Sequence, residues 1–174
     1  MAGEPDRSSR TMTDLSFSDL IGPLVQPGYR LACALLHDPE LAEDVVQESS
    51  VIAWRKLKRL EGPGRARAWF FGIVANECRN ARRTGWLRRV SFGIPRSVSI
   101  ASGEDTWVTH EDVRKALSML SHKDRLAVSL YFYLDLPVDE VAGILGSSAD
   151  ATRKRLHRAV RRLRPDLAVE EALR

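Results

Sequence analysis

Residues 137–164 read PVDEVAGILGSSADATRKRLHRAVRRLR, and this stretch decides the fold of the surrounding half of the chain. Apolar residues recur at helical spacing before Gly146 and again after it, which predicts a helix over residues 137–145 and a second one that ends at about Arg164. Two helices joined by a tight turn that starts with glycine are the outline of a helix-turn-helix. The two apolar stripes consist of Val138, Val141, Ala142 and Leu145, and of Thr152, Leu156, Ala159, Val160 and Leu163.

The second helix of this pair is strongly basic. Seven Lys or Arg residues and no acid lie between Arg153 and Arg164. Clustered cations repel one another unless an anion is present, so we favour nucleic acid as the partner, with this helix in a major groove. The alternative is an ordinary helical hairpin with a solvated basic face. The outward-facing candidates are Arg153, Lys154, His157, Arg158 and Arg161.

The rest of the chain is also predicted to be helical, because no sustained alternation of period two indicates strands. Residues 91–105 are rich in Ser and Gly and lack an apolar stripe, which is typical of a linker. We therefore predict an all-α fold of two small helical domains joined by a flexible linker. The predicted segments are a disordered N-terminus (1–14), a first domain (15–90), the linker (91–108), a second domain (109–167) and a tail (168–174).

Helix boundaries in the first domain follow from prolines and capping residues. Residues 17–36 are predicted as two short helices, or as one helix broken at Pro27. Asp38 is a suitable cap with Pro39 at the first helical position, and the helix that they begin runs to about Lys58. A further helix covers about residues 66–83.

The second domain opens with an apolar stripe at helical spacing within residues 113–120. Ser121 and Asp124 then resemble a capping box with Asp in the Glu position, which predicts a helix to about Leu134.

The helix after Asp38 carries an unusual acidic face. Five acids and no Lys or Arg lie between Asp38 and Glu48. One interpretation is a protein-docking surface, because aromatic residues on a polar rim are typical interface anchors. The other is that Trp54 packs on the following helix while the acids favour the helix N-terminus. The face in question groups Asp44, Gln47 and Glu48 with Val51 and Trp54.

The helix at about residues 66–83 mixes aromatic residues with amides and arginines, and five arginines without an acid lie between Arg79 and Arg89. Such a mixture can hold unstacked nucleic-acid bases. The alternative is that Trp69 and Phe70 belong to the core and that the arginines are solvated. The residues concerned are Trp69, Phe70, Phe71, Asn76, Arg79, Asn80, Arg82 and Arg83.

Composition excludes several classes of protein. The net charge is +4 and 44% of residues are apolar, as in a folded domain. No stretch approaches the roughly 18 apolar residues of a membrane span, so we expect no membrane insertion. The first 13 residues lack the apolar core of a signal peptide, and two cysteines give no disulfide framework, so we expect a cytoplasmic protein. The four histidines do not cluster, and no catalytic motif is found. We predict no metal, no cofactor and no enzymatic activity.

Four segments in the expected order resemble one family, the extracytoplasmic-function (ECF, group 4) RNA polymerase sigma factors. Residues 38–48 with Ala53-Trp54-Arg55, and residues 68–76, are similar to region 2 of that family. Residues 135–146 and 155–159 are similar to region 4. Together they cover nearly the whole predicted folded length, with a linker between them.

The resemblance implies a role for each matching segment. Core RNA polymerase would be bound by Asp44, Gln47, Glu48, Val51 and Trp54, of which Asp44 and Gln47 match positions that dock on a coiled coil of the largest subunit. The −10 promoter element would be bound by Arg65, Arg67, Trp69, Asn76, Arg79, Asn80 and Arg83, with the loop at residues 58–67 accepting a flipped-out base. The −35 element would be bound by Ser148, Arg153, Lys154, Arg155, His157, Arg158 and Arg161. The linker would run toward the polymerase active-site cleft, and an anti-sigma factor is a further expected partner.

One segment departs from the family pattern. Ser147 and Thr152 stand where apolar turn contacts are usual, and Asp150 adds an acid close to the expected DNA phosphates. We expect an altered −35 preference and a less stable turn. Two other functions stay open at this point: a stand-alone helix-turn-helix regulator, which would usually bind DNA as a dimer, and a sigma-like interaction protein that no longer initiates transcription.

Overall fold

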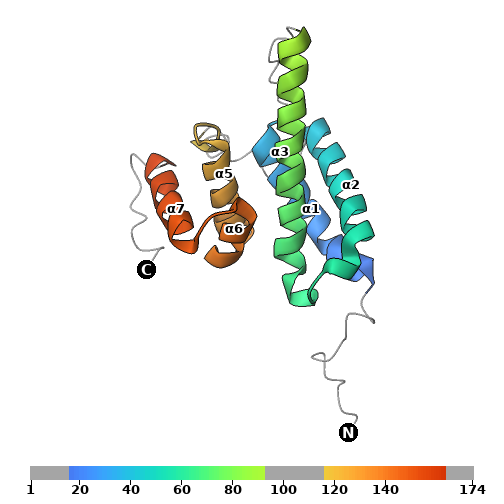
Figure 1. Ribbon diagram of the computed structural model, residues 1–174. Coiled ribbons are helices and arrows are strands. Elements are labelled where there is room, and N and C mark those ends of the chain that lie inside the picture. The colour runs from blue at the N-terminus through green and yellow to red at the C-terminus, as the bar shows by residue number, and fades with distance from the viewer. Residues whose placement is uncertain (1–15, 93–115, 164–174) are drawn as a thin grey trace.

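The computed structural model describes residues 16–92 and 116–163, and within these ranges the chain forms two helical units (Figure 1). The N-terminal unit contains α1 (Phe17–Leu36), α2 (Pro39–Lys56) and α3 (Ala66–Phe92), with the short 3-10 helices Leu57–Arg59 and Pro63–Arg65 between α2 and α3. The C-terminal unit contains α5 (His122–Val128), the π-helical turn η5 (Ser129–Tyr133), α6 (Val138–Leu145) and α7 (Ala149–Leu163). The expected all-α fold is confirmed. The predicted disordered N-terminus, the tail and nearly all of the linker lie outside the described residues.

α1 is one helix, so the predicted break at Pro27 is wrong. Both Pro23 and Pro27 lie inside it, although each proline removes a backbone hydrogen bond. Burial offsets this loss, because the apolar side of α1 packs Ile21, Leu31 and other residues into the core. A capping box at Ser16 holds the start of the helix, as its hydroxyl oxygen accepts a hydrogen bond from the Asp19 N–H at 3.2 Å.

α1 and α3 approach each other closely at Gly28. A Cβ atom added there would lie 3.0 Å from Cε1 of Phe70, so even an alanine would require the Phe70 ring to shift slightly. Phe70 itself is fully buried, which fixes α3 against α1 and leaves the opposite side of α3 for other contacts.

α2 begins as predicted. The side chain of Asp38 accepts a hydrogen bond from the Leu41 N–H at 3.1 Å, and Pro39 occupies the first turn. The α-helix ends at Lys56, where the chain tightens into a 3-10 turn. Its buried side comprises Ala42, Val45, Val46, Ser49 and Ala53.

α3 is longer than predicted. It extends to Phe92 rather than to Arg83, and so enters the first two residues of the predicted linker. No proline interrupts the sequence before Pro95, so nothing removes a backbone donor from the ladder. Figure 1 shows the C-terminal part of α3 projecting beyond the other helices.

The C-terminal unit confirms the predicted helix-turn-helix. The hydroxyl of Ser121 caps α5 by accepting a hydrogen bond from the Asp124 N–H at 3.2 Å. After η5 the chain turns at Asp135, whose φ of 49° is left-handed, and then enters α6. α6 and α7 follow at almost the predicted boundaries.

The two units are packed against each other. α3 contacts α6, and α1 contacts α5 and η5, so the buried residues of both units form one continuous core. In Figure 1, α5 and α6 lie between α3 and α7. We call this packing of α1 and α3 on α5, η5 and α6 the closed arrangement.

Candidate nucleic-acid and protein interfaces

The turn between α6 and α7 is held by its own polar residues. Gly146 adopts a left-handed φ of 64°, which suits glycine, and ends α6. The hydroxyl oxygens of Ser147 and Thr152 are 2.8 Å apart, and Thr152 is fully buried. Ser148 caps α7 by accepting a hydrogen bond from the Ala151 N–H at 3.2 Å. The polar residues that depart from the family pattern therefore satisfy one another.

α7 exposes most of its predicted DNA-binding residues on one side. Thr152, Leu156 and Ala159 face the core. Nη1 of Arg153 lies 2.8 Å from Oδ1 of Asp150, but this ion pair is exposed to solvent and leaves the guanidinium accessible. The exposed basic residues are Arg153, Lys154, His157, Arg158, Arg161 and Arg162.

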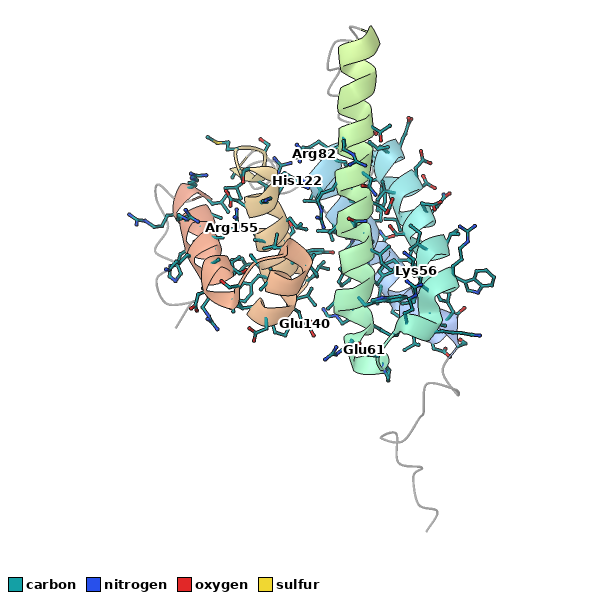
Figure 2. All side chains as sticks on the ribbon, in the orientation of Figure 1. Lys56, Glu61, Arg82, His122, Glu140 and Arg155 are labelled. Atoms are coloured by element: carbon teal, nitrogen blue, oxygen red, sulfur yellow. The ribbon has the colours of Figure 1, made fainter. Side chains whose placement is uncertain are left out.

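Arg155 differs from the other basic residues of α7. Its side chain is only 27% exposed, and Nη1 lies 2.7 Å from Oδ1 of Asp124 on α5. Arg162 approaches Oδ2 of the same carboxylate at 3.4 Å. Figure 2 shows Arg155 on the side of α7 that faces α5. Arg155 was predicted to bind the −35 element, and in the structure it ties α7 to α5.

Asp124 is a residue whose role the sequence did not indicate beyond helix capping. Burial raises the pKa of its carboxyl group, but the hydrogen bonds from Ser121 and Arg155 and the nearby arginine charges outweigh burial and lower the pKa overall. The lowered pKa favours the charged carboxylate, which holds Arg155, and with it α7, against α5.

The acidic side of α2 is a solvent-exposed surface with an apolar centre. Trp54 is 66% exposed and Val51 is 39% exposed. Trp54 is therefore not packed on the following helix, as the alternative interpretation required, and its docking role stays a prediction. Nε2 of Gln47 donates to Oε1 of Glu43 at 3.3 Å, one turn earlier on α2. We call this the docking surface; it comprises Asp44, Gln47, Glu48, Val51 and Trp54, all exposed.

α3 brings four of the predicted −10 residues onto two turns of one helix. Asn76, Arg79 and Arg83 are exposed and Asn80 is half-buried. Glu77 holds the amides, because its Oε1 accepts hydrogen bonds from Asn80 at 3.2 Å and from Asn76 at 3.5 Å. Sequence reasoning had not singled out Glu77.

Two of the three aromatic residues at positions 69–71 of α3 belong to the core. Phe70 and Phe71 are fully buried, whereas Trp69 is half-buried. Of the aromatic residues on this helix considered as base-stacking candidates, only Trp69 is accessible in the closed arrangement.

Arg65 and Arg67 are the two remaining −10 candidates. Arg65 ends the 3-10 helix Pro63–Arg65, and Arg67 lies in the first turn of α3. Arg65 forms an exposed ion pair with Glu61. The guanidinium of Arg67 donates to the backbone carbonyl of Leu134 in the C-terminal unit. Arg67 therefore links the two units by a hydrogen bond, whereas Asn76 and the other −10 candidates lie farther along α3.

A cluster of cationic groups that the sequence did not indicate lies between α3 and α5. Both ring nitrogens of His122 are buried without a hydrogen-bond partner in the described structure. Burial, followed by the charges of Arg82, Arg125 and Arg79, lowers the pKa of His122 from 6.5 to about 4. Figure 2 shows His122 on α5 facing Arg82 on α3.

Arg125, a buried residue of α5, lies close to His122. It is 8% exposed and donates to the carbonyls of Leu117 at 2.8 Å, Ser118 at 3.1 Å and Leu120 at 3.2 Å. Its Nη1 also reaches the carbonyl of Ala34 on α1 at 3.4 Å and contacts Nε2 of His37.

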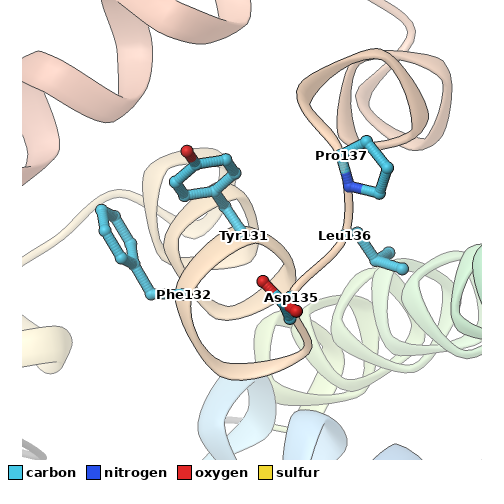
Figure 3. A pocket seen from close by; sticks show the side chains of 5 residues that line it. All are labelled: Tyr131, Phe132, Asp135, Leu136 and Pro137. Atoms are coloured by element: carbon cyan, nitrogen blue, oxygen red, sulfur yellow. The ribbon is translucent and has the colours of Figure 1, made fainter. Parts of the chain in front are cut away.

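A shallow hollow on the C-terminal unit is shown in Figure 3; it is lined by Tyr131, Phe132, Asp135, Leu136 and Pro137.

Among the described residues, no three metal-ligating side chains come together, and no helix is long and apolar enough to cross a membrane. Cys33 and Cys78 are free thiols, and burial raises the pKa of Cys78 to about 12.

Comparison with known proteins matches both units to one family. The family model described as Sigma-70 region 2 matches residues 20–88, and that described as Sigma-70, region 4 matches residues 110–163. The ECF RNA polymerase sigma factor SigL of Mycobacterium tuberculosis is 31% identical over 142 residues, which are 78% of this chain and 80% of SigL. RNA polymerase sigma factor SigV of Bacillus subtilis is 26% identical over 147 residues, or 84% of this chain and 87% of SigV.

Two solved structures share the fold. The sigma factor RpoE from Bartonella quintana, in complex with the anti-sigma factor NepR, superposes with a TM-score of 0.74 at 28% identity, over 84% of this chain and 93% of RpoE. CnrH in complex with the cytosolic domain of CnrY gives a TM-score of 0.61 at 25% identity, over 84% of each chain.

An acidic surface with an exposed tryptophan, a helix-turn-helix with a basic second helix and the two family matches define a transcription initiation factor. The chain belongs to the sigma-70 family, as an ECF sigma factor that binds core RNA polymerase and directs initiation at promoters. The matches cover both helical units in order and give no support to a stand-alone regulator.

Proposed function

We propose that three separate surfaces of this sigma factor share the work of initiation. The docking surface of α2 binds core RNA polymerase, α3 binds the −10 element and α7 binds the −35 element. The observation that carries this division is the 66% exposure of Trp54 beside the acids of α2, because a protein that bound only DNA would have no use for an acidic surface with an exposed apolar centre.

The −10 element would be held on α3 after its strands separate. Asn76 and Asn80 offer amide donors and acceptors for base edges, and Arg79 and Arg83 supply charge for the phosphates. The accessible part of the Trp69 ring would contact an unpaired base, which offsets part of the cost of opening the duplex. Arg65 and Arg67, at the start of α3, would contact the strand that leaves this site.

The −35 element would be read by α7. Its capped N-terminus at Ser148 and the exposed side chains of Arg153, Lys154, His157 and Arg158 suit the edges and phosphates of a major groove. Arg161 would contact a phosphate farther along the helix. Arg155 contributes by holding α7 on α5, and a direct DNA contact from it would require release from Asp124.

The wider setting follows from these roles. Catalysis would belong to the polymerase, so the sigma factor would need no cofactor and would have no enzymatic activity of its own. It would act in the cytoplasm, where transcription takes place. Because RpoE and CnrH were solved with NepR and with the cytosolic domain of CnrY, we propose an anti-sigma protein as a further partner.

One experiment tests the division of labour. The protein is added to core polymerase with a library of random promoters, and the transcript starts are sequenced. We expect starts that share two sequence elements, one near −10 and one near −35. Starts that share no element, or a failure to bind core polymerase, would reject the proposal.

A further inference from the structure

Glu77 is the only acidic residue in the 27-residue sequence of α3, and every other charged residue of this helix is an arginine. An acid on a DNA-binding helix opposes binding, because it repels the phosphates that the arginines attract. Within residues 16–92 and 116–163, Glu77 forms no ion pair with an arginine, so its charge is not neutralised in that way. Its hydrogen bonds go instead to two neutral amides.

The two amides belong to Asn76 and Asn80, which are both among the residues that we propose to bind the −10 element. Oε1 of Glu77 accepts a hydrogen bond from Nδ2 of Asn80 at 3.2 Å and from Nδ2 of Asn76 at 3.5 Å. Residues three positions apart on a helix are neighbours on its surface, which places Asn80 within reach of Glu77. The shorter bond is the stronger of the two, so Glu77 holds Asn80 more firmly than Asn76.

A carboxylate fixes the direction of an amide that it holds. It only accepts hydrogen bonds, whereas an asparagine amide donates from its nitrogen and accepts at its oxygen. A half-turn of the Asn80 amide would bring its oxygen against Oε1 of Glu77, where two acceptors repel each other. The oxygens of Asn76 and Asn80 are therefore directed away from Glu77, and in the described part of the chain neither oxygen accepts a hydrogen bond.

These amides lie on a side of α3 that a DNA strand can reach. Positions 69, 73, 76, 80 and 83 recur every three or four residues and so share one side of the helix. Asn76 and Arg83 are exposed, while Trp69 and Asn80 are half-buried. A ring for an unpaired base, two amides for base edges and a guanidinium for a phosphate thus follow one another along this side. What a base edge meets there depends on which end of each amide is turned outward.

Base edges fall into two classes according to the group that an amide oxygen would meet. Adenine and cytosine present an amino group, which donates a hydrogen bond, whereas guanine and thymine present a carbonyl oxygen, which accepts one. An amide oxygen turned toward the DNA pairs with the first class and repels the second. An amide that turned freely could present its nitrogen to the second class, and it would lose the distinction.

We propose that Glu77 is a positioning residue for the −10 element: it directs the amide of Asn80, and more weakly that of Asn76, so that α3 selects adenine or cytosine over guanine or thymine where these amides meet the DNA. This inference rests on the proposed function of α3. Glu77 touches no base itself and acts through the two amides. Its negative charge lowers the affinity of α3 for any DNA, while its hydrogen bonds raise the selectivity between bases. A substitution of Glu77 should therefore change affinity and selectivity in opposite directions.

Two substitutions and their combination test this role in the full-length protein bound to core polymerase. Glu77→Gln keeps the length and the helix preference of the side chain, but its amide can donate as well as accept, so it does not fix the direction of Asn80. Asn80→Ala removes the amide itself. The probes are single-stranded oligonucleotides that carry the −10 element found in the wild-type starts, with each position in turn changed to each of the other bases. Fluorescence anisotropy measures the affinity for every probe.

We expect the wild type to prefer adenine or cytosine over guanine or thymine by about tenfold or more at one position of the element. Glu77→Gln should reduce this ratio to about threefold or less, and it should bind all probes more tightly at low salt because it removes a negative charge. Asn80→Ala should lose the same preference. The double variant should match Asn80→Ala in base ratio, because Glu77 acts through Asn80.

An unchanged base ratio in Glu77→Gln, with a uniform gain in affinity, would overturn the proposal and show that Glu77 acts through its charge alone. A wild-type preference for guanine or thymine at the position that Asn80→Ala affects would overturn it as well. If Asn80→Ala changes no base ratio at any position, the proposed role of Asn80 in reading the −10 element fails, and this inference fails with it. The Asn80→Ala variant thus distinguishes failure of the proposed function from failure of the role of Glu77.

Discussion

The hydroxyl oxygens of Ser147 and Thr152 lie 2.8 Å apart across the turn between α6 and α7, and Thr152 is fully buried. From the sequence we expected these two polar residues to weaken the turn. The structure shows them as a mutually satisfied pair, and a buried hydroxyl is costly only when it lacks a partner.

Removal of one member of this pair should therefore cost more than removal of both. Ser147→Ala leaves the buried Thr152 hydroxyl without its partner, and we expect the free energy of unfolding to fall by about 1–2 kcal/mol. The double variant Ser147→Ala with Thr152→Val should recover about 1 kcal/mol of this loss. Urea denaturation of the wild type, both single variants and the double variant gives the coupling energy. A coupling energy of zero would show that the hydrogen bond contributes nothing to the turn.

Substitution of two arginines of α7 should distinguish an effect on protein stability from an effect on DNA binding. Arg155 is half-buried on Asp124, whereas Arg158, one turn later on α7, is exposed. We expect Arg155→Ala to lower the free energy of unfolding by about 1–3 kcal/mol, because it leaves a partly buried carboxylate without its main partner. Arg158→Ala should leave stability within about 0.5 kcal/mol of the wild type and weaken binding of −35 duplex DNA, with a shallower salt dependence.

Denaturation and DNA titration at several salt concentrations check both variants of this pair. The lowered pKa of Asp124 also predicts how the stability difference between the wild type and Arg155→Ala changes with pH. A carboxylate whose pKa is depressed by folding stabilises the protein above its unfolded pKa and loses this contribution as pH falls. The stability difference between the wild type and Arg155→Ala should therefore shrink in acid. The same difference at neutral and strongly acidic pH would contradict the assigned ion pair.

His122 should make the free energy of unfolding depend on pH at higher pH values than Asp124 does. Its pKa is about 4 in the folded protein against an ordinary value of 6.5, so the unfolded chain takes up the proton first as pH falls. The folded state thus loses stability from about pH 6.5 downward until His122 is protonated there too. We expect a loss on the order of 1 kcal/mol at pH 5, after allowance for the solvent that still reaches this half-buried residue.

Replacement of His122 by Gln isolates this effect. His122→Gln should flatten the change in the midpoint of urea denaturation between pH 7 and pH 5, whereas His157→Gln, a change at an exposed position on α7, should leave it as in the wild type. If both variants follow the wild-type curve, the buried ring of His122 is not the source of the pH dependence.

Local signals predicted the helices well, because caps and periodicity are properties of neighbouring residues. The Asp38 cap, the Ser121 cap and the turn at Gly146 appear where they were expected. Pro27 misled the prediction, since the local cost of a proline inside a helix is offset by burial against α3, which the local pattern of α1 does not reveal. The extension of α3 to Phe92 was missed, although Trp86, Leu87 and Val90 recur at helical spacing beyond Arg83.

The contacts between distant residues could not be predicted in the same way. Asp124 and Arg155 are 31 residues apart in the sequence, and Arg67 and Leu134 are 67 apart. When a helix carries many basic residues, its sequence does not show which of them will contact another part of the protein. The DNA-binding sets stay a prediction from the family resemblance, and the contacts of Arg155 and Arg67 within the protein depend on tertiary packing.

The docking surface gives the last prediction. Asp44→Lys combined with Gln47→Ala should abolish binding to core polymerase while leaving the affinity of the free protein for −10 and −35 DNA unchanged, because neither residue lies on α3 or α7. Trp54→Ala alone should weaken core binding by at least tenfold, since truncation of a central aromatic anchor costs about 2 kcal/mol or more. Met119→Ala is the matched control, because Met119 is an apolar residue that is 84% exposed on the other unit. Fluorescence anisotropy of the labelled protein with core polymerase and with DNA measures both affinities. A parallel loss of DNA affinity would mean that α2 acts on DNA binding directly, and an equal effect of Met119→Ala would mean that core binding does not depend on this surface.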